Sequence, residues 1–125
     1  DFCLSRGLGD VYKRQVVEDD IYIQDGEARL HIFPLPSSHA KGCVALEVND
    51  EWCFLGDALY SMQKCGHNLY NAGILKDEIN VLQNIKAEKF MLSHRTPFEK
   101  PKGIIMRWLG EIYDRRVKGE VYIEI

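Results

Sequence analysis

Residues 43–57 read CVALEVNDEWCFLGD, and this stretch decides the fold. It holds two short apolar runs, Cys43–Val48 and Trp52–Leu55, separated by Asn-Asp-Glu. Apolar runs of this length around a polar break predict two strands joined by a tight turn. The second run ends in Gly-Asp, so the carboxylate of Asp57 follows directly on a predicted strand.

The residues before this stretch predict a hairpin. Val16–Gln24 is rich in Val, Ile and Tyr, and Ala28–Phe33 alternates apolar with polar side chains, so both predict strands. Between them, residues 25–26 (Asp-Gly) are a strong turn signal because both accept a positive φ. Pro34 ends the return strand, and residues 36–42 predict a polar loop.

The residues after this stretch first predict a loop and then a helix. Residues 58–75 show no clean period, and a loop of that length in a compact domain is often functional. Apolar side chains at helical spacing predict a helix over residues 75–85. Asp77 and Glu78 suit the N-terminus of that helix, where its dipole favours acidic side chains.

The last third of the chain predicts a strand, a helix and a strand. Lys89–Leu92 is a short buried strand, and prolines interrupt residues 97–101. Residues 104–112 carry the apolar face of a second helix that ends near Gly119, and residues 121–125 alternate as a last strand. The resulting order, ββ-ββ-α-β-α-β, is typical of a mixed α/β or α+β domain.

Composition narrows the class of protein. A chain of 125 residues with 46% hydrophobic and 28% charged residues is typical of one soluble globular domain. No apolar run approaches the roughly 18 residues of a membrane helix, so no membrane partner is expected. The net charge of −3 without a basic cluster argues against a nucleic-acid partner. Four cysteines without a CxxC pair, and no signal peptide, predict a cytoplasmic protein with reduced thiols.

Three polar residues share one structural context. His39, Asp57 and His94 each follow a predicted strand or lie in the loop beside one, and each comes after a small residue. If the strands are neighbours, the three side chains converge at one edge of the sheet. Two imidazoles and a carboxylate are a partial ligand set for zinc, and are compatible with iron or manganese. The alternative is that the three side chains are solvated and never meet.

The order and spacing of three motifs point to a family. They are PSSHAKGC at residues 36–43, CFLGDALY at residues 53–60 and FMLSHRTP at residues 90–97. In this order they resemble the third, fourth and fifth metal-ligand motifs of the metallo-β-lactamase-like hydrolases. Those motifs are a Gly-His with a Gly three residues later, a strand ending in Gly-Asp, and a strand ending in Gly-His. Here serine replaces the glycine before both histidines.

The resemblance covers residues 16–125 and implies the C-terminal half of an αββα sandwich, a mixed sheet flanked by helices. It implies that His39 binds a first metal, that Asp57 bridges two metals as the catalytic carboxylate, and that His94 binds the second. The expected cofactor is zinc, with two ions in the intact domain. The implied activity is attack of a metal-bound hydroxide on an ester, thioester, lactone or phosphoester in a small-molecule substrate.

One family motif is missing from the chain. The first ligand cluster, His-x-His-x-Asp-His, has no counterpart here. Residues 5–15 (SRGLGDVYKRQ) resemble the translation of a sequencing adapter, so we expect residues 1–15 to be an artefact and native sequence upstream of Val16 to be absent. With three ligands, the chain as given is expected to bind metal weakly and to be nearly inactive.

Other residues are weaker candidates. Lys41, Tyr60 and Arg95 lie beside the three motifs and would contact substrate, although a solvated or packed role is the alternative for each. His31 is expected to be exposed on the polar side of its strand, and His67 to lie in an exposed loop.

Two other functions compete with the hydrolase. One is a non-catalytic α/β binding or scaffold domain, and the other is a mononuclear domain that metal stabilises without catalysis. The sequence leaves the oligomeric state open. Half of a two-sheet sandwich would leave apolar strand residues without partners, so the chain is expected to aggregate. These residues are Leu30, Ile32, Val44, Leu46 and Phe54.

Overall fold

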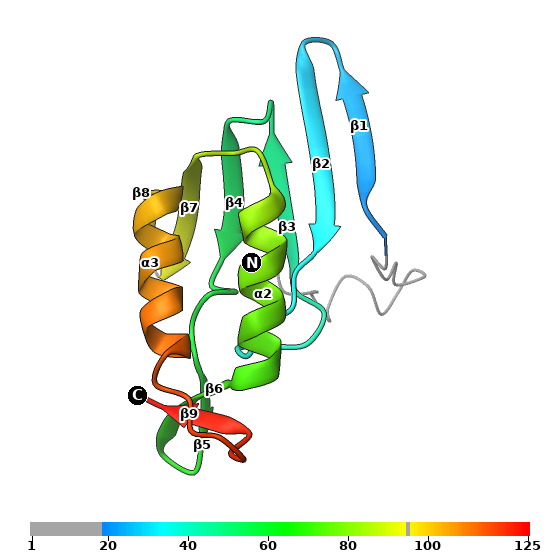
Figure 1. Ribbon diagram of the computed structural model, residues 1–125. Helices are drawn as coiled ribbons and strands as arrows, with labels where there is room; N and C mark the ends of the chain where they lie inside the picture. The colour runs from blue at the N-terminus through cyan, green and yellow to red at the C-terminus, as the bar shows by residue number, and fades with distance from the viewer. Residues whose placement is uncertain (1–18, 95) are drawn as a thin grey trace.

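The computed structural model describes residues 19–94 and 96–125. The elements are β1 (Ile21–Asp25), β2 (Ala28–Pro34), β3 (Val44–Val48), β4 (Trp52–Gly56), β5 (Met62–Lys64), β6 (His67–Asn71), α2 (Ala72–Asn84), β7 (Lys89–His94), β8 (Thr96–Pro101), α3 (Lys102–Tyr113) and β9 (Tyr122–Glu124). A six-stranded sheet has the order β1-β2-β3-β4-β7-β8, and a smaller sheet has the order β5-β6-β9. Both helices lie over one face of the large sheet (Figure 1). The predicted mixed α/β class is therefore confirmed.

The first four strands form an antiparallel meander, as the sequence predicts. Gly26 takes a φ of +60° in the turn between β1 and β2, which is the conformation that the Asp-Gly signal requires. β3 and β4 coincide closely with the two apolar runs of residues 43–57. Residues 16–18 of the first predicted strand lie outside the described residues.

The predicted loop over residues 58–75 is wrong in part. Residues 62–71 form the β5–β6 hairpin, and β9 adds to β6 to complete the small sheet. Most side chains of this hairpin are exposed, so the sequence carries no hydrophobic alternation to reveal it. Cys65 and Gly66, both with positive φ, make its turn.

The helices begin or end at other residues than predicted. α2 starts at Ala72, because the side chain of Asn71 caps it by accepting a hydrogen bond from the backbone N–H of Ile74 at 3.0 Å. Asp77 and Glu78 therefore lie within the helix rather than at its N-terminus. α3 ends at Tyr113, well before Gly119. Neither described helix has the length and apolarity that crossing a membrane requires.

The prolines near residue 97 do not interrupt the sheet. Residues 96–101 form β8, which pairs antiparallel with β7. β8 is the last strand of the large sheet, and an edge strand tolerates proline because its outer side needs no N–H donor. The prolines predict a break in the chain, so the strand over residues 96–101 is not apparent from the sequence.

The main core lies between the helices and one face of the large sheet. Sheet residues such as Phe33, Ala45, Cys53 and Phe90 are buried there, with exposed fractions of 2% or less. Leu75, Leu82, Leu109 and Ile112 cover them from the helices. Cys43 is also buried, and Cys53 and Cys65 are free cysteines.

The opposite face of the large sheet is apolar as well. Successive side chains of a strand point to opposite faces, so the strand register identifies its members. They are Ile21, Ile23, Leu30, Ile32, Val44, Leu46, Val48, Trp52, Phe54 and Met91. None belongs to the core or to the side chains packed against it. Ile23 is exposed and the other nine are half-buried, and both described helices lie over the opposite face of the sheet. We call this surface the open face.

Glu78 is a polar residue in the core. It is fully buried on α2, and neither carboxyl oxygen has a hydrogen-bond partner among the described residues. Desolvation raises the pKa of Glu78 well above its ordinary value. Burial of this side chain therefore favours the neutral carboxylic acid over the carboxylate.

Replacing Glu78 by leucine is expected to stabilise the chain by about 1–3 kcal/mol at pH 7, because an unsatisfied buried polar group is removed. A carboxyl whose folded pKa lies above its unfolded value of 4.5 makes the fold less stable as pH rises above 4.5. Urea unfolding at pH 5 and pH 7 should show the larger gain at pH 7. Glu111→Leu, at an exposed position of α3, is the control. Equal effects of the two variants would contradict the prediction.

Candidate metal centre

The loop that carries His39 is held in place by two buried serines. The Ser37 hydroxyl donates to the carbonyl oxygen of Ala58 and accepts a hydrogen bond from the backbone N–H of His39 at 3.1 Å. The hydroxyl oxygen of Ser38 accepts a hydrogen bond from the backbone N–H of Asn71 at 2.9 Å. Ser37 is 8% exposed and Ser38 is 7% exposed, so these bonds are shielded from water. They tie the His39 loop to Ala58, directly after β4, and to Asn71 at the end of β6.

Asp57 comes from a sharp turn at the end of β4. Gly56 has a φ of +59°, a conformation that residues with a side chain rarely adopt. The chain reverses at once, with backbone hydrogen bonds from Ala58 to Leu55 and from Tyr60 to Asp57. The turn places the half-buried carboxylate of Asp57 beyond the sheet edge.

His39 and Asp57 meet, as the sequence predicts. Nε2 of His39 lies 3.2 Å from Oδ2 of Asp57. The other ring nitrogen, Nδ1, lies 3.1 Å from the carbonyl oxygen of Ser61. The two side chains are 35% and 30% exposed, so water and small molecules reach the pair.

Both ring nitrogens of His39 face hydrogen-bond acceptors, the Ser61 carbonyl oxygen and the Asp57 carboxylate. A carbonyl oxygen only accepts hydrogen bonds, so the contact with Ser61 favours the ring form that carries a proton on Nδ1. In the neutral ring Nε2 is then a bare acceptor, and it faces a carboxylate that also only accepts. Two acceptors at 3.2 Å repel each other unless a cation separates them. A proton on Nε2 removes this repulsion, and so does a metal ion bound between the two atoms.

The pair fits a metal ion. Zinc binds imidazole nitrogen and carboxylate oxygen at about 2.0–2.1 Å, so two such ligands at a tetrahedral angle lie about 3.3–3.4 Å apart. The observed separation of 3.2 Å is close to this value. The hydrogen bond from Nδ1 to a backbone carbonyl is also the usual support of a metal-binding histidine, because it fixes the tautomer that leaves Nε2 bare.

The backbone places His94 at the same end of the strands as Asp57, the C-terminal end of β4 and β7. β4 and β7 are neighbouring parallel strands, with Gly56 opposite Leu92. Asp57 and His94 therefore follow paired positions and emerge at the same ends of adjacent strands. The side chain of His94 lies outside the described part of the structure. Among the described side chains, no group of three or more His, Cys, Asp or Glu is arranged to hold a metal.

The predicted substrate contacts have different environments. Lys41 is exposed, and Arg95 lies outside the described residues. Tyr60 is half-buried beside the pair and contacts Trp108 edge-on, with ring centroids 6.4 Å apart. Desolvation, with a smaller contribution from the charge of Asp57, raises the pKa of Tyr60. Its phenol is therefore a hydrogen-bond donor at neutral pH.

Sequence reasoning missed two features and misjudged a third. The Ser61 contact uses a backbone oxygen, and no side-chain pattern marks such a partner. The sequence predicts only a polar loop around Ser37, and no pattern in it marks the buried hydroxyl. His31 is not exposed as expected: its side chain is 15% exposed and lies between two carboxylates. His67 is exposed as expected, although it lies in β6 and pairs with Glu124.

The structure thus places a histidine–aspartate pair in the loops at one end of the strands of a mixed sheet. Both members come from loops anchored to β4 or to the start of α2. Neither a scan of protein-family models nor a search of curated proteins finds a match to this chain.

Proposed function

We propose that the chain is part of a metal-dependent hydrolase of the metallo-β-lactamase-like superfamily. The proposal rests on the 3.2 Å separation between His39 Nε2 and Asp57 Oδ2. Nδ1 of the same ring lies 3.1 Å from the carbonyl oxygen of Ser61, so Nε2 is the nitrogen available to a metal ion. The order and spacing of the three sequence motifs support the same proposal. Esters, thioesters, lactones and phosphoesters are the proposed substrate classes.

Each residue of the centre has a proposed role. His39 and Asp57 hold a divalent cation, zinc by preference, and His94 extends the site from the adjacent strand. Such a cation supplies Lewis acidity and lowers the pKa of bound water. Ser37 and the Ser61 carbonyl keep the His39 ring in one orientation. Tyr60 donates its phenol proton in a hydrogen bond to a substrate oxygen, and Lys41 and Arg95 attract a negatively charged substrate.

Metal binding tests the proposal. Titration of the chain with Co²⁺, followed by visible absorption, and with Zn²⁺, followed by calorimetry, is expected to give weak binding at one site. His39→Ala and Asp57→Asn each remove a ligand, so each is expected to weaken binding by more than the roughly 10–100-fold that a change in a supporting residue causes. His67→Ala is the matched control, because His67 is another histidine paired with a carboxylate, Glu124.

The outcomes separate the proposal from its alternatives. Equal losses in His39→Ala and His67→Ala, or unchanged binding in both site variants, would leave a binding or scaffold domain as the better hypothesis. The source DNA upstream of the codon for Val16 gives an independent test. A continuous frame that contains His-x-His-x-Asp-His supports the hydrolase, and a native frame without that cluster contradicts it.

A further inference from the structure

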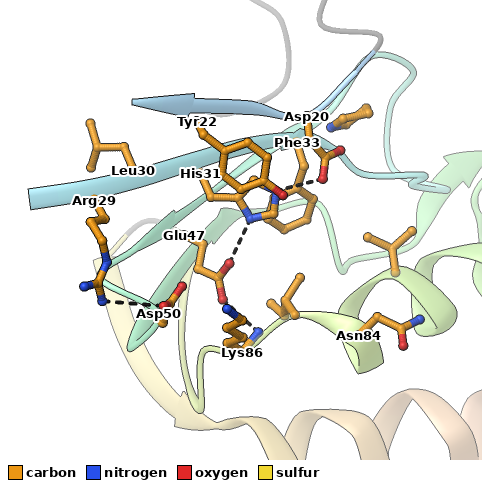
Figure 2. Close-up of a pocket in the computed structure, with 13 residues that line it drawn as sticks. Asp20, Tyr22, Arg29, Leu30, His31, Phe33, Glu47, Asp50, Asn84 and Lys86 are labelled. Carbon is orange, nitrogen blue, oxygen red and sulfur yellow. Dashed lines mark hydrogen bonds and ion pairs between the residues drawn. The ribbon is translucent and has the colours of Figure 1, made fainter. Parts of the chain in front are cut away.

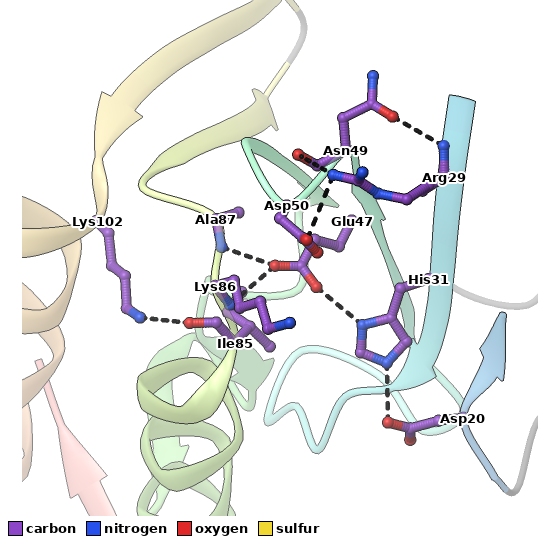
Figure 3. Close-up of polar contacts among 10 residues, drawn as sticks. All are labelled: Asp20, Arg29, His31, Glu47, Asn49, Asp50, Ile85, Lys86, Ala87 and Lys102. Carbon is purple, nitrogen blue, oxygen red and sulfur yellow. Dashed lines mark hydrogen bonds and ion pairs between the residues drawn. The ribbon is translucent and has the colours of Figure 1, made fainter. Parts of the chain in front are cut away.

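His31 joins three segments of the chain through both of its ring nitrogens (Figure 3). Nδ1 lies 2.8 Å from Oε1 of Glu47 on β3, and Nε2 lies 2.8 Å from Oδ2 of Asp20, directly before β1. His31 itself is on β2, with its side chain only 15% exposed. It therefore connects the start of the edge strand β1 to the buried side of β3.

This geometry requires a doubly protonated ring. Each carboxylate accepts hydrogen bonds and donates none, and a neutral imidazole has only one N–H. A neutral His31 would therefore leave one nitrogen facing a carboxylate oxygen at 2.8 Å with no proton between them. As an imidazolium, His31 donates one hydrogen bond to each carboxylate.

The two carboxylates are held very differently. Glu47 is 3% exposed, and its other oxygen accepts hydrogen bonds from the backbone N–H groups of Lys86 and Ala87 at 2.9 and 2.7 Å. Asp20 is 50% exposed, and His31 is its one partner among the described residues. If His31 loses a proton, the remaining N–H stays hydrogen-bonded to the buried Glu47, and the hydrogen bond to Asp20 is lost.

The other groups around His31 do not replace this link. Tyr22 stacks on the ring with centroids 4.4 Å apart, and Phe33 packs against it at 4.8 Å. The nearby cation Arg29 is paired with Asp50. These residues, with Lys86, line a pocket of about 630 Å³ between the β1–β2 hairpin and the end of α2 (Figure 2). Asp20, Tyr22 and His31 form the hairpin side of that pocket.

We propose that His31 is a proton-controlled latch: with both nitrogens protonated it fastens the start of β1 to Glu47, and loss of one proton frees Asp20 and loosens the hairpin wall of the pocket. The latch is independent of the proposed metal centre, because neither His39 nor Asp57 lines this pocket.

The direction of the pH dependence follows from the environment of His31. Desolvation by itself would lower the pKa of His31, but the hydrogen bonds to Glu47 and Asp20 and their negative charges together raise it above the ordinary 6.5. A histidine with a raised folded pKa contributes its full stability below 6.5 and loses it as pH rises through the folded value. The latch is therefore closed near pH 6 and opens as pH rises through the folded pKa of His31, which lies above 6.5.

Hydrogen exchange of the full chain at low micromolar concentration, read by mass spectrometry, tests the latch. Exchange of the imidazole C2 proton gives the pKa of His31, and amide exchange gives the protection of β1 relative to β3. From pH 6 to pH 9 the relative protection of β1 is expected to fall about tenfold for each unit by which the pKa of His31 exceeds 6.5. Protection of β3 should stay constant after correction for intrinsic rates.

Two variants complete the test. Asp20→Asn removes an exposed carboxylate, so the fold survives, and β1 should have the low protection of the open latch even at pH 6. Asp19→Asn, the exposed neighbouring position, is the matched control and should behave like the parent chain. A pKa of His31 at or below 6.5, a relative protection of β1 that does not change with pH, or equal effects of the two variants would each overturn the proposal.

Discussion

Replacing Glu47 by alanine is expected to destabilise the chain by about 3–5 kcal/mol, the range measured when one partner of a buried ion pair is removed. Glu47 is 3% exposed and accepts hydrogen bonds from the backbone of Lys86 and Ala87 and from the ring of His31. The variant leaves the backbone N–H groups of Lys86 and Ala87 and the Nδ1–H of His31 without their acceptor. A chain of this size has a total stability of only 5–15 kcal/mol, so such a loss brings it close to unfolding.

Urea unfolding followed by circular dichroism measures this loss. Glu51→Ala is the matched control, because Glu51 is also a glutamate of the β3–β4 region but forms only an exposed ion pair with Lys89 at 3.0 Å. An exposed pair contributes at most about 1 kcal/mol. If the Glu47 and Glu51 variants unfold within 1 kcal/mol of each other, the buried network does not anchor the junction between α2 and β7.

The parent chain is expected to self-associate through its open face. Monomeric proteins rarely expose contiguous apolar patches of more than a few hundred Å². The open face crosses strands β1, β2, β3, β4 and β7 without a polar interruption in β2–β4. Introducing Thr at both Ile32 and Leu46, which face each other across β2 and β3, keeps good strand formers while removing apolar area from the centre of the patch. The double variant is therefore expected to be largely monomeric.

Sedimentation velocity over a hundredfold range of concentration measures the difference. The control is Ile104→Thr, because Ile104 is a 47% exposed apolar residue of α3, away from the open face. This variant should associate like the parent chain. A parent chain that stays monomeric over the whole range would contradict the prediction, as would an Ile104 variant that dissociates as fully as the double variant.

Hydrophobic patterning predicted the strands whose side chains alternate between apolar and polar or are apolar throughout. The strands β2, β3 and β4 alternate or are apolar throughout, and the Asp-Gly turn sets the first hairpin, so the sequence located them closely. The β5–β6 hairpin was missed because only Tyr70 of its residues is buried. β8 was missed because its prolines are tolerated only at a sheet edge, and the sequence alone does not reveal which strand lies there.

The candidate site was predictable to a similar extent. The placement of His39 and Asp57 after neighbouring strands predicted their convergence, which the structure shows. The Ser61 carbonyl was not predictable, since every residue has one. The burial of His31 depends on Glu47 sixteen positions away, and a charged residue inside an alternating strand normally indicates a solvent-facing side.

The parallel pairing of β4 with β7 has a consequence for the order of folding. β1 to β4 pair with their sequence neighbours and close by short turns, whereas β7 joins β4 only after the intervening hairpin and helix have crossed over. Contacts between residues far apart in the chain carry a larger entropy of loop closure and form more slowly. The pairing of β4 with β7, which brings Asp57 and His94 to the same end of the sheet, is thus expected to form late in folding. A nascent chain that has not yet emerged beyond α2 therefore holds only His39 and Asp57 of the three residues proposed to bind metal.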